Sequence, residues 1–183
     1  MPYTTIQKDF FRESGKWLNS LQVRQKLINP NLHYIYVLRK CQQHRKKNPL
    51  GIYWRVLLRN LQIRYGFQIY PETQIGEGLY LGHWGTVVIN KAVKIGKNCN
   101  IAHGVTIGQS NRGKKKGAPI IGNEVWIGTN AVVVGAITIG DNVLIAPNAY
   151  VTTDVPSNSV VVGNPAKIIA KNNATEGYIN NKI

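Results

Sequence analysis

Aliphatic residues return every six positions through the second half of the chain, and a glycine or another small residue usually follows each one. The clearest runs are Ile89, Ile95, Ile101 and Ile107, then Ile121, Ile127, Val133, Ile139, Ile145 and Val151. A period of six fits neither an amphipathic helix nor a freely alternating strand. It is typical of the hexapeptide repeat of a parallel β-helix, in which three short strands close one triangular coil. The pattern therefore predicts a mainly β fold whose coils stack at roughly 4.8 Å.

The register of the repeat predicts which aliphatic residues share a side of this prism. With three repeats per coil and two extra residues near Val87, one side would hold Leu81, Ile101, Ile121 and Ile139. The next side would hold Ile89, Ile107, Ile127 and Ile145. The residues after this second set are Asn90, Gly108, Gly128 and Ala146, most of them very small. Such a column suits a long, thin ligand lying against the backbone. Glycine follows the aliphatic residue on all three sides, however, so the column alone is weak evidence for a groove.

The chain divides into three parts by pattern. Residues 1–66 lack the six-residue period and read as a basic helical segment, with helices over 5–28, 31–46 and 49–66 and a weak point at Gly15. Residues 67–170 form the β-helix, interrupted by a polar, Lys-rich loop over 109–119. Residues 171–183 are a polar tail that we expect to be loosely held.

Charge narrows the choice of partners. The 23 Lys and Arg residues outnumber the 8 Asp and Glu residues and give a net charge of +15, concentrated in the helical segment and in the loop. A strong positive field attracts nucleic acid, anionic lipid, acidic polysaccharide or a phosphorylated cofactor. No nucleic-acid motif accompanies the charge, so we expect no nucleic-acid partner.

The compartment is predicted from the cysteines and the N-terminus. Two cysteines make no disulfide framework, and Cys99 occupies an inward position of its repeat, so we expect a small buried hydrophobe there. No signal peptide and no membrane-spanning run is recognisable. We therefore expect a cytoplasmic protein, whose basic helices are able to contact an anionic membrane peripherally.

Two histidines are the candidates for chemistry. His83 lies where the register slips by two residues, and His103 holds the same third position in a later repeat, so the two should stack one coil apart. An imidazole serves as a general base near neutral pH, although a polar residue in a surface turn has the same pattern. A zinc site would need a third ligand, and His33 and His44 lie in the helical part, so we expect no metal.

The chain from about Phe67 to Ile169 resembles the serine acetyltransferase branch of the hexapeptide-repeat acyltransferases. The motifs that carry the resemblance are Ile69-Tyr70-Pro71, Leu81-Gly82-His83-Trp84-Gly85-Thr86-Val87-Val88, Gly104-Val105-Thr106-Ile107-Gly108 and Val162-Gly163-Asn164-Pro165-Ala166-Lys167. The resemblance implies a left-handed parallel β-helix, acetyl-CoA as the acetyl donor, and a homotrimer with active sites in the clefts between neighbouring prisms.

The resemblance also implies roles for individual residues. His83 matches the general base of the family, and His103 is a second catalytic candidate because it should stack on His83. The positions that match the lining of the pantetheine arm of CoA are Gly108, Gln109, Gly128, Thr129, Ala146 and Pro147. Lys167 and the loop residues Lys114, Lys115 and Lys116 are candidates for the CoA phosphates.

Departures from the family pattern fall on the acceptor side. Gln68 stands where the family pairs an Asp with the catalytic His, although its amide oxygen is still able to orient the ring. Gly82 replaces a carboxylate that grips the amino group of serine, and Gly117-Ala118 replaces an Arg-His pair that binds the serine carboxylate. The departures favour acetyl transfer to a sugar hydroxyl of a polysaccharide precursor, as in capsule, colanic acid and O-antigen O-acetyltransferases. Serine O-acetylation and a non-catalytic scaffold or polyanion-binding protein are the alternatives.

Overall fold

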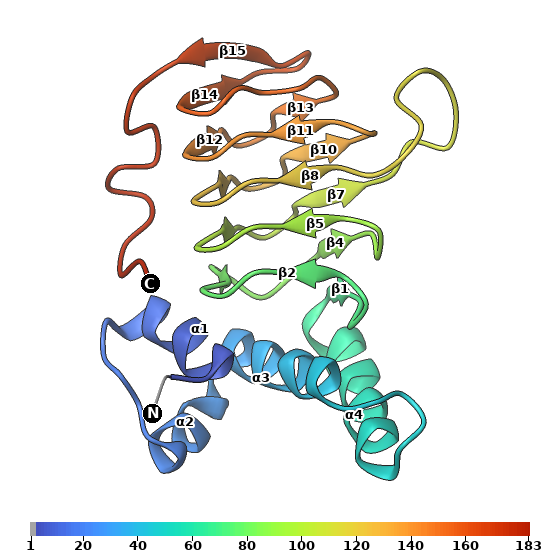
Figure 1. Cartoon of the computed structure of the whole chain (residues 1–183), viewed down its shortest axis with the longest axis vertical. Helices are drawn as coiled ribbons and strands as arrows, with labels where there is room; N and C mark the ends of the chain where they lie inside the picture. Colours follow the sequence, from blue (N-terminus) through green and yellow to red (C-terminus); the bar gives the residue numbers. More distant parts are fainter. Residues whose placement is uncertain (1–2) are drawn as a thin grey trace.

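The computed structural model describes residues 3–183 and contains a parallel β-helix with a group of helices at one end (Figure 1). The strands form three sheets, ordered β1-β4-β7-β10-β13, β2-β5-β8-β11 and β3-β6-β9-β12-β14-β15. All neighbours pair in parallel except β14 and β15, which are antiparallel. The mainly β parallel solenoid predicted from the repeat is confirmed.

The strands are short, as a six-residue repeat requires. The first sheet contains β1 (Phe67–Ile69), β4 (Val87–Ile89), β7 (Thr106–Gly108), β10 (Val132–Val134) and β13 (Tyr150–Val151). The second contains β2 (Gln74–Ile75), β5 (Lys94–Ile95), β8 (Ile120–Ile121) and β11 (Thr138–Ile139). The third contains β3 (Tyr80–Leu81), β6 (Asn100–Ile101), β9 (Trp126–Ile127), β12 (Val143–Ile145), β14 (Ser159–Val162) and β15 (Lys167–Ala170).

Stacked aliphatic side chains fill the prism. In the first sheet the inward residues Ile69, Ile89, Ile107, Val133 and Val151 are fully buried, and neighbouring members pair across adjacent strands. Burying one such side chain contributes about 1.5–3 kcal/mol relative to exposure. Cys99 is buried among them, as predicted, and burial raises the pKa of its thiol to about 12.

The predicted register is wrong beyond the loop. Leu81 and Ile101 continue onto Ile127 and Ile145 in the third sheet, whereas Ile121 and Ile139 belong to the second sheet. The cause is the segment 109–119, which leaves a single corner between β7 and β8 as a hairpin-like projection and replaces no strand (Figure 1). A count that treats this segment as repeats moves every later residue to a neighbouring side.

The predicted column of small residues changes with the register. Asn90 follows a strand of the first sheet and Gly108 ends one, while Gly128 and Ala146 follow strands of the third. The actual column after the third sheet is made by Gly82, Ala102, Gly128 and Ala146, whose N–H groups each donate to the next coil. This column lies directly beside His83 and His103 in the sequence, which the predicted column did not.

Four α-helices and one short 3-10 helix precede the β-helix. They are α1 (Thr5–Ser14), α2 (Ser20–Gln25), η1 (Lys26–Ile28), α3 (Pro30–Gln43) and α4 (Pro49–Tyr65). The single helix predicted over 5–28 is wrong, because Gly15 ends α1 in the left-handed region at φ 65°. Asn19 then caps a new helix through a capping box with Gln22. No helix within residues 3–183 has the length and hydropathy needed for a transmembrane span.

A buried ion pair fastens the helices to the first coil. The Nε of Arg39 in α3 donates to Asp9 Oδ2 of α1 at 2.7 Å, and Asp9 Oδ1 accepts from the N–H groups of Gly78 and Leu79. Arg39 also donates to the carbonyl oxygens of Ile75 and Gly76. Burial raises the pKa of Asp9 and the charge of Arg39 opposes that shift. The helices thereby cover the open end of the β-helix, which would otherwise expose its core.

The C-terminal tail is not loosely held, contrary to prediction. After β15 it runs back along the prism toward α1 (Figure 1), and Ala174, Thr175 and Ile179 are buried. Asn98 exchanges hydrogen bonds with the backbone N–H and C=O of Ile183. Composition suggested a free tail, but side-chain amides of the prism satisfy its backbone.

Candidate functional site

His83 and His103 lie one coil apart at the same corner of the prism. Strands β3 and β6 pair with Leu81 opposite Ile101. His83 and His103, each two positions further along, are therefore brought together. The ring centroids are 5.6 Å apart and the rings are nearly perpendicular. Both side chains are exposed. The predicted stacking of the two histidines is confirmed, and their catalytic roles remain predictions.

Later turns of the same corner continue the column of small residues toward the C-terminal end of the β-helix. Thr129 and Pro147 occupy the positions after Gly128 and Ala146, and backbone bonds link the turns from Asn130 N–H to His103 C=O and from Asn148 N–H to Thr129 C=O. At Gly128 a Cβ would lie 2.7 Å from the Pro147 nitrogen, so no larger residue fits without movement. The corner is therefore a close-packed backbone surface that leads away from the imidazoles.

Two hollows meet at His83. One, of about 260 Å³, is lined by Tyr80, Gly82, His83, Asn100, Ile101, Ala102, Trp126 and Thr129. The other, of about 300 Å³, is lined by His83, Trp84 and His103. Neither lining includes a carboxylate. His83 is therefore able to contact two different ligands, one in each hollow.

The wall of the first hollow contains residues that the sequence reasoning missed. Tyr80, Asn100 and Trp126 are opposite one another on β3, β6 and β9; Tyr80 and Trp126 are partly exposed, and Asn100 between them is buried. The tail braces this wall, because Tyr178 packs on Trp126 with ring centroids 4.9 Å apart and its carbonyl accepts from Asn100 Nδ2 at 3.0 Å. Arg12 of α1 donates to Asn100 Oδ1. A correct register would have grouped the three wall residues, whereas no sequence pattern indicates the tail contact.

Gln68 is exposed on β1, and its amide is engaged elsewhere. Gln68 Nε2 donates to Tyr70 Oη at 3.0 Å. Within residues 3–183 no hydrogen bond joins Gln68 to His83. The predicted orienting contact between Gln68 and the imidazole is therefore not made in this structure, and it stays a prediction.

The residues predicted to bind CoA are divided between two corners. Gly128, Thr129, Ala146 and Pro147 share the corner with the histidines, whereas Gly108 ends β7 and Gln109 follows it at the next corner, where the loop begins. Lys167 is exposed on β15. Lys115 of the loop pairs with Asp154 at 2.7 Å, and both side chains are largely exposed, so the pair contributes little stability.

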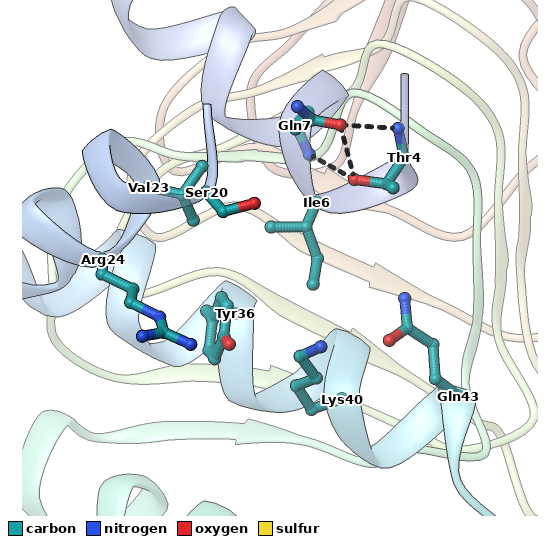
Figure 2. A pocket seen from close by; sticks show the side chains of 9 residues that line it. All are labelled: Thr4, Ile6, Gln7, Ser20, Val23, Arg24, Tyr36, Lys40 and Gln43. Atoms are coloured by element: carbon teal, nitrogen blue, oxygen red, sulfur yellow. Dashed lines mark hydrogen bonds between the residues drawn. The ribbon is translucent and has the colours of Figure 1, made fainter. Parts of the chain in front are cut away.

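A separate hollow of about 270 Å³ lies among α1, α2 and α3. Figure 2 shows the side chains around it: Thr4, Ile6, Gln7, Ser20, Val23, Arg24, Tyr36, Lys40 and Gln43. This lining offers cations and amides but no imidazole, thiol or carboxylate. Among residues 3–183 no group of three His, Cys, Asp or Glu side chains is placed to hold a metal ion. The histidine corner is therefore the best candidate for catalysis.

Comparisons with known proteins agree with the fold. Residues 118–153 match the family model described as bacterial transferase hexapeptide (six repeats). A serine acetyltransferase of Helicobacter pylori strain 26695 is 38% identical over 145 residues, which cover 79% of this chain and 84% of that protein. Serine acetyltransferase 2 of Arabidopsis thaliana is 41% identical over 105 residues, covering 57% of this chain and 32% of the plant protein.

Solved structures give the same result. The serine acetyltransferase of Neisseria gonorrhoeae superposes with a TM-score of 0.73 at 30% identity, covering 91% of this chain and 64% of that one. The Brucella abortus enzyme in complex with coenzyme A gives 0.73 at 27% identity, covering 92% and 66%. This chain is thus shorter than both solved relatives, yet it matches most of the Helicobacter protein at 38% identity. The chain belongs to the serine acetyltransferase family of hexapeptide-repeat acyltransferases.

Proposed function

We propose that the protein transfers an acetyl group from acetyl-CoA to the hydroxyl of a small acceptor, with His83 as general base. The observation that carries the proposal is the position of His83, exposed and shared by two hollows at one corner of the β-helix. The imidazole takes the hydroxyl proton as the oxygen attacks the thioester carbonyl. The tetrahedral intermediate then collapses with cleavage of the carbon–sulfur bond. The imidazolium returns its proton to the sulfur, so CoA leaves as the thiol and His83 is neutral again. His103 supports this step as the neighbouring imidazole.

The donor site is supported by the close-packed corner. Gly128, Thr129, Ala146 and Pro147 present backbone where a thin pantetheine arm is able to lie, and backbone N–H groups stabilise a developing oxyanion. The Brucella abortus relative is described in complex with coenzyme A. Lys167 and the loop lysines supply positive charge for the CoA phosphates. The donor also favours a cytoplasmic location.

A homotrimer completes this donor site in the proposal. Gly108 and Gln109 lie at a different corner from Gly128 and Thr129, so one prism does not bring both sets to one ligand. In a trimer, two neighbouring prisms each contribute one of these corners to a shared cleft, and both sets of residues then line the same CoA molecule. The division of the predicted CoA residues between corners supports a trimer.

Serine is the first acceptor to test. The relatives in the comparisons are described as serine acetyltransferases, and one gonococcal structure is described in complex with serine. Serine brings an ammonium and a carboxylate that a site must neutralise. Arg12, whose guanidinium donates to the wall residue Asn100, supplies positive charge near the histidine corner.

A sugar hydroxyl of a polysaccharide precursor is the second candidate. Tyr80 and Trp126 make an aromatic wall beside His83, and the lining of that hollow has no carboxylate to hold an ammonium. Gly82 and Gln68 occupy positions where the family pattern has carboxylates. An aromatic wall with few charges suits the apolar face of a sugar ring better than a zwitterion.

The test is release of CoA thiol from acetyl-CoA by purified protein, measured without acceptor, with L-serine and with N-acetylated hexosamines. Acceptor-dependent release that is lost in His83→Ala is expected. The Gly82→Asp variant should raise serine turnover relative to sugar turnover, because it adds a carboxylate beside His83. A protein that shows no thiol release with any acceptor, while still folded, would instead be a scaffold or polyanion-binding protein.

A further inference from the structure

Most of the positive charge between residues 14 and 71 has no acidic partner. From residue 14 to residue 71 the sequence contains no Asp or Glu and eleven cations: Lys16, Arg24, Lys26, Arg39, Lys40, Arg45, Lys46, Lys47, Arg55, Arg59 and Arg64. Within residues 3–183 only Arg39 of this set forms a salt bridge. The unpaired cations create a field that draws an anionic surface toward this end of the molecule.

The helix α4 exposes an apolar stripe inside this field. Ile52, Val56 and Ile63 are 53%, 58% and 71% exposed. At about 100° per residue, these three side chains lie within about 40° of one another around the helix. The opposite face buries Leu58 and Leu61 against the rest of the protein. We call Ile52, Val56 and Ile63 the α4 stripe.

Cations border the α4 stripe. A shallow hollow of about 380 Å³ is lined by Lys46, Ile52, Arg55, Val56, Arg59 and Asn60. Arg55 Nη1 donates to the carbonyl oxygens of His44 and Gly51, which holds its guanidinium beside the start of the helix. Long basic side chains lay their carbon stems along apolar surface while keeping the charge at its edge. The α4 surface therefore combines an apolar centre with a cationic border.

We propose that this surface of α4 binds an anionic phospholipid bilayer. A helix that lies in a membrane interface places apolar residues at the acyl boundary and Lys or Arg at the level of the phosphates. Each basic residue adds attraction to an anionic leaflet, and salt screens that attraction. The arrangement of Ile52, Val56 and Ile63 between Arg55, Arg59 and Lys46 meets both requirements on α4 and the turn before it.

A second copy of the chain fits this surface poorly. If two α4 stripes packed face to face, Arg55, Arg59 and Lys46 would meet the same cations of the other copy. The acid-free segment has no carboxylate to relieve this repulsion, and like charges brought together in an interface are unfavourable. A lipid phosphate supplies the missing negative charge.

The test uses the full-length protein and vesicles of phosphatidylcholine, alone or mixed with phosphatidylglycerol, in a sedimentation assay. The mixed vesicles should bind the protein at least ~10-fold more tightly at low salt, and high salt should weaken the binding. The double variant Val56→Glu with Ile63→Glu should lose this binding by ~10-fold or more. A matched control, Leu21→Glu with Ile28→Glu, alters residues that are 65% and 90% exposed in the same segment but outside α4.

The control separates charge from the α4 stripe, because both double variants add two negative charges to the same basic segment. Equal losses in the two variants would overturn the proposal, since only net charge would then matter. Absence of binding to phosphatidylglycerol at low salt would also overturn it. So would a wild-type oligomer that dissociates in Val56→Glu with Ile63→Glu, because the stripe would then face another copy. Far-ultraviolet circular dichroism of each variant confirms that it is folded.

Discussion

The turns that carry His83 and His103 occupy the same position in successive coils, yet different surroundings support them. The His103 turn lies within the stack: Gly104 is in the left-handed region at φ 74°, and its nearest neighbour is Asn130 of the next coil. The His83 turn borders the helical segment instead. Gly85 N–H donates to Tyr65 C=O and Val87 N–H to Gly66 C=O, at the end of α4.

This difference explains why one turn follows the repeat and the other departs from it. A turn between two coils must match the spacing of both neighbours, so its length is fixed. A turn that rests on a helix end on one side has only one such constraint, and it accommodates the additional residues around Trp84. Trp84 is 62% exposed and lines the hollow between the two imidazoles. We infer that the irregular turn is the one adapted to catalysis.

The largest expected effect distinguishes the two histidines. His83→Ala should lower kcat/KM for acetyl transfer by ~10²–10⁴, the usual contribution of a positioned general base. His103→Ala should lower it by less than ~10-fold, because that residue acts only through its neighbour. The measurement is thiol release at saturating acetyl-CoA. Equal losses in the two variants would remove the distinction between the turns.

The constraint on the His103 turn is tested by adding one methyl group. Gly104→Ala should lower the free energy of unfolding by about 1–3 kcal/mol, because its Cβ would overlap the Asn130 side chain and its φ is positive. The matched control is Gly82→Ala in the His83 turn, where the nearest atom is 3.7 Å from the added Cβ. This control should change the free energy of unfolding by less than about 0.5 kcal/mol. Urea unfolding of both variants measures the difference, and a tolerant Gly104 would contradict it.

A carboxylate near the irregular turn should increase the contribution of His83 to acetyl transfer. Gln68→Asp restores the residue type that the family pairs with its catalytic His, so it should preserve activity or raise kcat by up to ~10-fold. Breaking the hydrogen bond to Tyr70 is the cost of that change, and Tyr70→Phe serves as the control for its loss. A steep fall in kcat with Gln68→Asp, but not with Tyr70→Phe, would assign Gln68 to acceptor binding.

The sequence predicted the local features of the fold and the site well, and the contacts between distant parts of the chain poorly. The repeat predicts the coil, the inward positions and the stacking of His83 on His103, because each depends on local spacing alone. The register fails beyond Gln109, because composition reveals the loop but does not show how many of its residues belong to the repeat. It also fails for the wall of Tyr80, Asn100 and Trp126 and for Tyr178, which packs on it. These contacts join residues far apart in the chain, and no local period encodes them.

The smallest expected effect concerns the charge coupling of the two imidazoles. Protonated rings separated by 5.6 Å at an exposed corner repel by about 0.7 kcal/mol in a water-like dielectric. Because the base must be neutral to accept a proton, His103→Gln removes this repulsion and favours protonation of His83. We therefore expect the acidic limb of the rate–pH profile to move to higher pH in His103→Gln. The profile is measured as kcat/KM at constant ionic strength, and it should be repeated at high salt, where screening reduces the shift between wild type and variant. A limb that stays in place at low salt would show that His103 does not influence the base, and the two turns would then be independent.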